Sequence, residues 1–204
     1  MNHEETKELY EQVMGNEDRN NSNWDKGQSS MLMSMEVATM DFVKDMKPGK
    51  VLSIGCGNGR EAFKFAEWGW TAHGIDASKT AIRWDNELAK KLNVKNINFT
   101  QRLIEEVPDE EIKEYDVIEM GQTLEHIPDE NLDDVMRKIS LCPVFIGSVP
   151  LDKHFAHEAT HVREFSEQSL KEFLEQYYPN VFTQAHAAVH DWDKPNIIIF
   201  KATK

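Results

Sequence analysis

The stretch VLSIGCGNG, residues 51–59, constrains the fold of this chain more than any other. Its first four residues predict a short buried strand, and Gly55, Gly57 and Gly59 follow at alternate positions. Glycine adopts positive φ without strain and lets a ligand lie against bare backbone. A helix is predicted directly afterwards, over residues 60–69, so its free N–H groups face the same place and favour polar or anionic ligand atoms.

An acidic residue follows the turn at an informative distance. The second predicted strand, TAHGID, ends in Asp76, which is 17 residues beyond Gly59 and near the ~20 expected for a carboxylate that binds a ribose. A carboxylate accepts two hydrogen bonds at once, which suits the two hydroxyls of a ribose. The alternatives are a purely structural glycine turn and an Asp76 that caps the next helix, although Ser78 can also cap it. We expect a nucleoside cofactor.

Strand and helix patterns alternate along most of the chain. This alternation predicts an α/β fold with a doubly wound, mostly parallel, seven-stranded sheet of Rossmann-like type, helices on both faces and an antiparallel C-terminal hairpin. The strands are predicted at 51–54, 71–76, 97–101, 115–121, 143–149, 183–190 and 196–204. The helices are predicted at 60–69, 79–92, 129–140 and 166–178.

The first 46 residues read as a helical N-terminal extension that closes over the domain at 47–204 as a lid. Helices are predicted over 4–14 and 30–46, joined by a polar loop, and Trp24 follows that loop alone in polar surroundings. Trp24 either packs the extension onto the core or covers a ligand.

Composition limits the kinds of binding partner that this chain can have. Of the 204 residues, 23 are Lys or Arg and 36 are Asp or Glu, and the net charge of −13 argues against a nucleic-acid partner. No apolar run approaches the roughly 20 residues that cross a bilayer, and the polar N-terminus is unlike a signal peptide. Cys56 and Cys142 form no spaced metal pattern. We expect a cytoplasmic monomer or homodimer that acts on a small molecule.

The turn GCGNG has the spacing G-x-G-x-G, one residue short of the dinucleotide motif G-x-G-x-x-G. Together with GIDAS, this turn resembles the class I S-adenosylmethionine (SAM)-dependent methyltransferases. The resemblance extends to YDVIEMGQTLEHIPD at 115–129 and HVREFSEQSLKEFL at 161–174, and it spans residues 50–204. It implies SAM as the cofactor and S-adenosylhomocysteine (SAH) as the product, with the glycine turn under the amino-acid end of SAM and Asp76 on its ribose.

The resemblance also implies where the other cofactor contacts lie. Leu103 and Ile104 are expected to enclose the adenine, with backbone groups of residues 102–104 at its polar edge. Ser53 stands where many members have an acid that helps to hold the SAM amino group, so that contact must come from elsewhere. The predicted cofactor residues are Gly55, Cys56, Gly57, Asn58, Gly59, Asp76, Ala77, Leu103, Ile104, Met120 and Gln122. Cys56 is read as a small buried residue rather than a nucleophile.

Methyl transfer from SAM is an in-line displacement, which needs alignment and, for a protonated acceptor, a base. Glu125 and His126 follow the fourth predicted strand, and His161 follows the fifth. We predict these three as catalytic, with the histidines as general bases. The alternative is a structural role for Glu125 and His126. His154 and His157 read as exposed loop residues.

Some RNA 2′-O-methyltransferases and ubiquinone-type O-methyltransferases hold a divalent metal with E-x-x-E-H and a later histidine. Here Gln122 replaces the first Glu, so we predict no metal, although Glu125, His126 and His161 remain a candidate ligand set. The sequence thus predicts a small-molecule methyltransferase that acts on oxygen. The alternatives are the metal-assisted enzyme, a non-catalytic SAM-binding module and a nicotinamide-dependent dehydrogenase.

Overall fold

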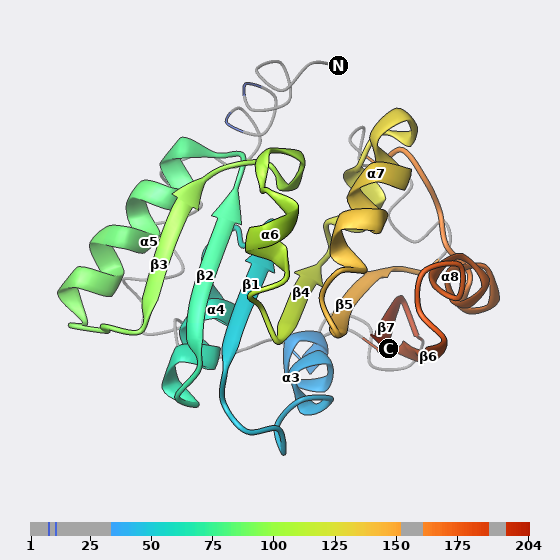
Figure 1. Ribbon diagram of the computed structural model, residues 1–204, viewed down its shortest axis with the longest axis horizontal. Helices are drawn as coiled ribbons and strands as arrows, with labels where there is room; N and C mark the ends of the chain where they lie inside the picture. Colours follow the sequence, from blue (N-terminus) through green and yellow to red (C-terminus); the bar gives the residue numbers. More distant parts are fainter. Residues whose placement is uncertain (1–7, 9–10, 12–33, 152–160, 188–194) are drawn as a thin grey trace.

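A computed structural model describes Glu8, Glu11 and residues 34–151, 161–187 and 195–204. The predicted sheet is confirmed: it has seven strands in the order β3-β2-β1-β4-β5-β7-β6 (Figure 1). The first five strands are parallel, and β7 pairs antiparallel with both β5 and β6. The strands are β1 (Lys50–Ile54), β2 (Thr71–Asp76), β3 (Ile97–Gln101), β4 (Val117–Gly121), β5 (Val144–Pro150), β6 (Asn180–His186) and β7 (Ile197–Thr203).

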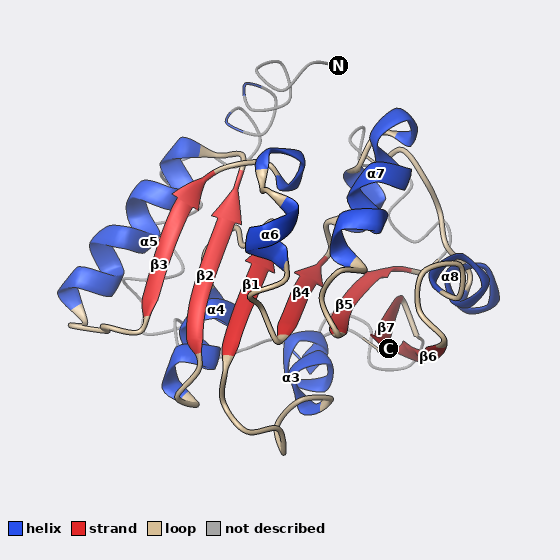
Figure 2. Ribbon diagram, in the orientation of Figure 1, coloured by secondary structure: helices blue, strands red, loops and turns tan. Residues whose placement is uncertain are grey.

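Helices cover both faces of the sheet (Figure 2). Apolar residues of three helices pack on one face around Phe65 and Ile146; these are α3 (Ser34–Asp41), α4 (Arg60–Glu67) and α5 (Lys79–Lys91). The other face buries Leu52 and Ile118 under α6 (Asp109–Ile112), α7 (Asp129–Ile139) and α8 (Glu167–Leu174). Two short 3₁₀ helices, η2 (Ile104–Glu106) and η3 (Leu124–His126), follow β3 and β4.

The strand order places the glycine turn at the point where the order of successive strands reverses. From β1 the chain runs outward to β2 and β3, then returns to β4 on the other side of β1. Crossovers from β1 and β4 therefore leave in opposite directions, which opens a crevice beyond the carboxyl ends of these two strands. The turn after β1 and η3 after β4 border this crevice.

Several predicted boundaries need correction. The strand predicted from Thr183 begins at Asn180, because the pairing of β6 with β7 starts at Asn180 and Thr203. The helix predicted over 166–178 ends at Leu174, and the buried Tyr178 hydroxyl instead donates a hydrogen bond to Ile139 O at 2.8 Å. The helix predicted over 30–46 is helical from Ser34 to Asp41.

The described parts of the N-terminal extension contact the domain. Lys201 Nζ on β7 donates a hydrogen bond to Phe42 O at 2.9 Å, just beyond α3. Most of the helix predicted over 4–14 and all of the loop with Trp24 lie outside the described residues. The division at residue 46 and the lid function stay predictions. Within the described residues, no helix is long and apolar enough to cross a membrane.

Candidate functional site

The glycine turn is a tight, left-handed bend. Gly55, Gly57 and Gly59 have φ values of 66°, 54° and 68°. A Cβ at Gly55 would lie 2.3 Å from Thr123 Oγ1, and one at Gly59 would lie 2.9 Å from the Phe99 ring. Conformation and crowding therefore both require glycine at these two positions, as the sequence pattern indicates.

Asp76 fixes this turn from the neighbouring strand. Its Oδ2 accepts a hydrogen bond from Gly57 N at 2.9 Å, and its Oδ1 accepts one from Ser78 N at 2.8 Å. Burial raises the pKa of Asp76 above its usual value, and the hydrogen bonds from Ser78 and Gly57 oppose that rise. Ser78 Oγ, rather than Asp76, caps α5 by accepting from Ala81 N. Each carboxylate oxygen of Asp76 keeps a second lone pair.

Glu11 of the N-terminal extension reaches the start of α5, beside Asp76. Its carboxylate accepts hydrogen bonds from Ser78 Oγ at 2.8 Å and from Thr80 N at 3.1 Å. Burial alone would raise the pKa of Glu11, but the hydrogen bonds from Thr80 and Ser78 outweigh it, so the pKa lies below its ordinary value. The extension thus adds a second carboxylate next to the predicted ribose site.

The predicted contacts around the turn differ in their surroundings. Cys56 is buried, and burial raises the pKa of its thiol well above the ordinary value, which makes it a poor nucleophile. Ala77 and Met120 are also buried, whereas Asn58 is half-buried. Their contacts with a cofactor stay predictions.

The backbone expected at the polar edge of the adenine makes hydrogen bonds within the protein. Arg102 N donates to Asp76 O at 3.0 Å, and Leu103 N donates to Glu106 Oε2 at 2.8 Å. These two N–H groups already have partners within the protein. Ile104 lies in the apolar core, and Leu103 is half-buried. Their role beside an adenine stays a prediction.

The three predicted catalytic residues lie together at the end of β4. Glu125 and His126 belong to η3, and the rings of His126 and His161 meet edge to face with centroids 4.7 Å apart. His126 Nε2 lies 3.9 Å from Glu125 Oε1, and the Glu125 side chain is buried. One ligand atom from each residue fits within 4.8 Å of the others. The fold thus brings His161 to a motif that precedes it by 35 residues.

Arg163, which sequence reasoning missed, holds this arrangement together. Its guanidinium donates to Leu124 O at 2.7 Å and to Asp129 Oδ1 at 2.6 Å. Val162 N also donates to Glu125 O at 3.0 Å. The segment that carries His161 is therefore fastened to η3 through Val162 and Arg163, and no local sequence pattern signals these long-range contacts.

Gln122 has an unusual backbone conformation, with φ of 51°. Its N–H donates to Ser148 O at 2.8 Å, and its Nε2 donates to Ser148 Oγ at 3.1 Å. Gln122 thus ties the end of β4 to β5, and its predicted contact with the cofactor remains untested.

A second group of polar residues lies between the sheet and the helices α3 and α4. Ser53 Oγ on β1 donates a hydrogen bond to Glu119 Oε2 on β4 at 2.6 Å. Arg60, the first residue of α4, forms an ion pair with the buried Glu36 of α3. Sequence reasoning singled out Ser53 only for its missing charge and did not find Glu36, Arg60 or Glu119.

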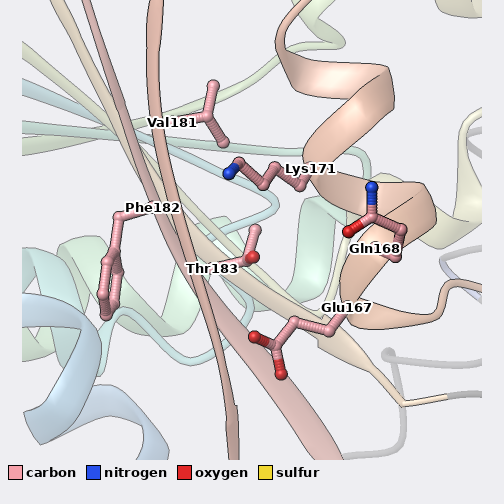
Figure 3. Close-up of a pocket in the computed structure, with 6 residues that line it drawn as sticks. All are labelled: Glu167, Gln168, Lys171, Val181, Phe182 and Thr183. Atoms are coloured by element: carbon pink, nitrogen blue, oxygen red, sulfur yellow. The ribbon is translucent and has the colours of Figure 1, made fainter.

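A surface pocket lies elsewhere, between α8 and the edge strand β6 (Figure 3). Its volume is about 350 Å³. The lining residues are Glu167, Gln168, Lys171, Val181, Phe182 and Thr183. Strand β6 is separated from β1 by β4, β5 and β7, so this pocket is distinct from the crevice at the glycine turn.

Comparison with known proteins agrees with this geometry. Residues 45–142 match a family model described as a methyltransferase domain. A ubiquinone biosynthesis O-methyltransferase from Acinetobacter baumannii is 36% identical over 80 residues, which are 39% of this chain and 34% of that protein. One from Alkalilimnicola ehrlichii is 30% identical over 111 residues, which are 52% of this chain and 44% of that protein. The chain thus matches less than half of the length of either relative.

Solved structures show the same fold at low identity. The 1,6-didemethyltoxoflavin-N1-methyltransferase of Burkholderia thailandensis, solved with its substrate and SAH, superposes with a TM-score of 0.73 at 17% identity. The match covers 99% of this chain and 89% of that one. The methyltransferase domain of a bacterial Hen1 gives a TM-score of 0.66 at 16% identity, over 82% of this chain and 95% of that one.

The sheet order, the glycine turn and the acid after β2 define a Rossmann-like methyltransferase domain. Residues 45–142 form a methyltransferase domain of the class I SAM-dependent type. This match decides against the nicotinamide-dependent dehydrogenase as an alternative.

Proposed function

We propose that this protein binds SAM in the crevice beyond β1 and β4 and transfers its methyl group to an oxygen atom of a small molecule. The observation that carries the proposal is the glycine turn fixed by Asp76, whose carboxylate accepts from Gly57 N at 2.9 Å. This bond sets the bare backbone of the turn and an acceptor for ribose hydroxyls in one rigid unit. SAM supplies an activated methyl group on a sulfonium.

The residues at the end of β4 fit the second requirement, removal of a proton from the acceptor. An imidazole nitrogen of His126 or His161 would accept the proton that the acceptor hydroxyl gives up. Glu125, with a carboxylate oxygen 3.9 Å from His126 Nε2, stabilises the imidazolium that results. Arg163 and Val162 keep His161 against η3, so the imidazole rings of His126 and His161 are already in position when the acceptor binds.

Binding and transfer are tested separately. Titration calorimetry with SAH tests the cofactor site, and transfer of labelled methyl from SAM to a panel of phenols and catechols tests the chemistry. Replacing His126 or His161 by Ala is expected to lower turnover by about 10²–10⁴-fold, the usual worth of general-base catalysis, with SAH affinity unchanged. Binding of SAH without transfer to any acceptor would favour a non-catalytic SAM-binding module, and failure to bind SAH would refute the proposal.

A metal-assisted reaction is a second candidate, and one observation favours it. Glu125, His126 and His161 offer one carboxylate oxygen and two imidazole nitrogens within 4.8 Å of one another. This set suits a divalent ion, which would activate an acceptor hydroxyl when bound. Thermal unfolding with Mg²⁺, Mn²⁺ or Zn²⁺ after treatment with a chelator tests it. A rise in melting temperature that His161→Ala abolishes would support this candidate, and no rise with any of these ions would exclude it.

A further inference from the structure

Ser53 and Glu119 form a pair across the two central strands, at the mouth of the glycine turn. They are register partners in the parallel pairing of β1 with β4, so their side chains leave the same face of the sheet side by side. Ser53 Oγ donates to Glu119 Oε2 at 2.6 Å, and both side chains are buried, with Glu119 only 3% exposed. A hydroxyl therefore holds a carboxylate in one position beneath the crevice.

The other oxygen of Glu119 is directed to the carboxyl end of β4. A Cβ placed on Gly121, the last residue of β4, would lie 3.1 Å from Glu119 Oε1 and 3.5 Å from Glu61 Oε1. Two carboxylate oxygens, from the strand and from the first turn of α4, thus converge over a position without a side chain. Gly55, the first residue of the glycine turn, is only two residues beyond Ser53.

The charges around this position are not balanced within the described residues. Three carboxyl groups, those of Glu36, Glu61 and Glu119, surround the guanidinium of Arg60. Arg60 forms an ion pair with Glu36 and also attracts Glu61, which shares a side-chain hydrogen bond with Glu36, and Glu61 and Glu119 lie on two sides of the space over Gly121. Burial raises the pKa of Glu119 well above its ordinary value, and the neighbouring Glu61 and Glu36 add to that rise, while the hydrogen bond from Ser53 opposes it. A cationic group brought into this space would relieve the repulsion.

We propose that Glu119, positioned by Ser53, receives the α-ammonium group of the methionyl tail of SAM. The inference rests on the proposed function, and it assigns to β4 the acidic contact whose usual place on β1 is occupied by Ser53. Glu119 is a binding residue, and Ser53 is a positioning residue that acts through it. Glu36 and Glu61 complete the acidic surroundings, so α3 of the N-terminal extension contributes to the same end of the site.

The test compares two ligands that share adenosine and sulfur but differ in the tail. SAH carries the amino-acid tail, and 5′-methylthioadenosine carries only a methyl group in its place. Titration calorimetry with the full chain is expected to show that Glu119→Gln lowers SAH affinity by tenfold or more and leaves 5′-methylthioadenosine affinity unchanged. Glu114→Gln removes an exposed carboxylate that pairs with Lys50 at the start of β1, the end of the strand away from the crevice. This variant is the control and is expected to change neither affinity.

A second pair of variants separates charge from fold. Ser53→Ala keeps the Glu119 carboxylate and removes only its donor, so SAH affinity is expected to fall several-fold while 5′-methylthioadenosine binding is kept. Ser53→Asp combined with Glu119→Ser moves the carboxylate back to β1 and is expected to restore SAH affinity. Normal SAH binding by folded Glu119→Gln, or by Ser53→Ala if the first variant fails to fold, would overturn the inference. Failure of the unmodified protein to bind either ligand would instead refute the proposed function.

Discussion

Asp85 on α5 is a buried acidic residue without a hydrogen-bond partner among the described residues. Its side chain is 1% exposed. It lies against the glycine turn, since a Cβ at Gly59 would be 3.0 Å from Asp85 Cγ. Burial raises the pKa of Asp85 well above its ordinary value, and Asp76 and Glu61 raise it further. We predict that Asp85→Ala stabilises the protein.

The size of the gain follows from three contributions. Removing a buried polar group without a partner is worth about 1–3 kcal/mol. The small cavity that remains costs about 1 kcal/mol. A raised pKa means that the folded state holds the proton more tightly, so the unmodified protein loses stability as pH rises above the unfolded pKa of Asp, at up to about 1.4 kcal/mol per pH unit. The variant lacks this loss, and its advantage grows until the pH reaches the folded pKa.

Thermal and urea unfolding at pH 5, 6 and 7 measure the effect. A gain of 1 kcal/mol corresponds to about 2–4 °C in melting temperature for a chain of this size. Asp45→Ala, which removes an exposed aspartate, is the matched control and is expected to change the melting temperature by less than about 2 °C at every pH. A variant Asp85→Ala that is less stable than the unmodified protein, with the same dependence on pH, would refute the reasoning.

Three further predictions concern the site. Asp76→Ala leaves Gly57 N and Ser78 N without acceptors, so it is expected to lower the free energy of unfolding by about 2–4 kcal/mol in urea and to weaken SAH binding in calorimetry; unchanged values would contradict the geometry. Gly55→Ala places a side chain at positive φ against Thr123 and is expected to cost more than about 2 kcal/mol in the same urea assay, whereas a smaller cost would show that the turn adapts. Arg163→Ala releases His161 and is expected to lower kcat with little change in SAH affinity, and substrate-saturated kinetics decide whether it does.

The features that could be predicted from the sequence are those that depend on residues close together in the chain. The glycine turn, the acid at the end of β2 and the helix after the turn lie within 26 residues, and their periodicity and turn chemistry fix them. The proximity of His161 to His126 came from the resemblance to a known family rather than from the residues themselves. Its physical cause, the contacts of Val162 and Arg163 with η3, became evident only in the structure.

The features that sequence did not predict depend on register and on packing between distant segments. The bond between Ser53 and Glu119 requires β1 and β4 to be neighbours in one particular alignment, which strand patterns alone do not specify. The ion pair of Arg60 with Glu36 depends on where α3 docks. The start of β6 at Asn180 depends on its partner β7, because the pairing of the two strands begins at Asn180 and Thr203.

The alignment of β1 with β4 also bears on how such domains change over time. Two segments 66 residues apart in the chain present equivalent places side by side, so a charged group can be exchanged sideways between them with little displacement in space. A comparison of aligned sequences that treats each position separately would record a lost acid at residue 53 and an unrelated gain at residue 119. A comparison that treats register partners on β1 and β4 together would record one acid in both cases.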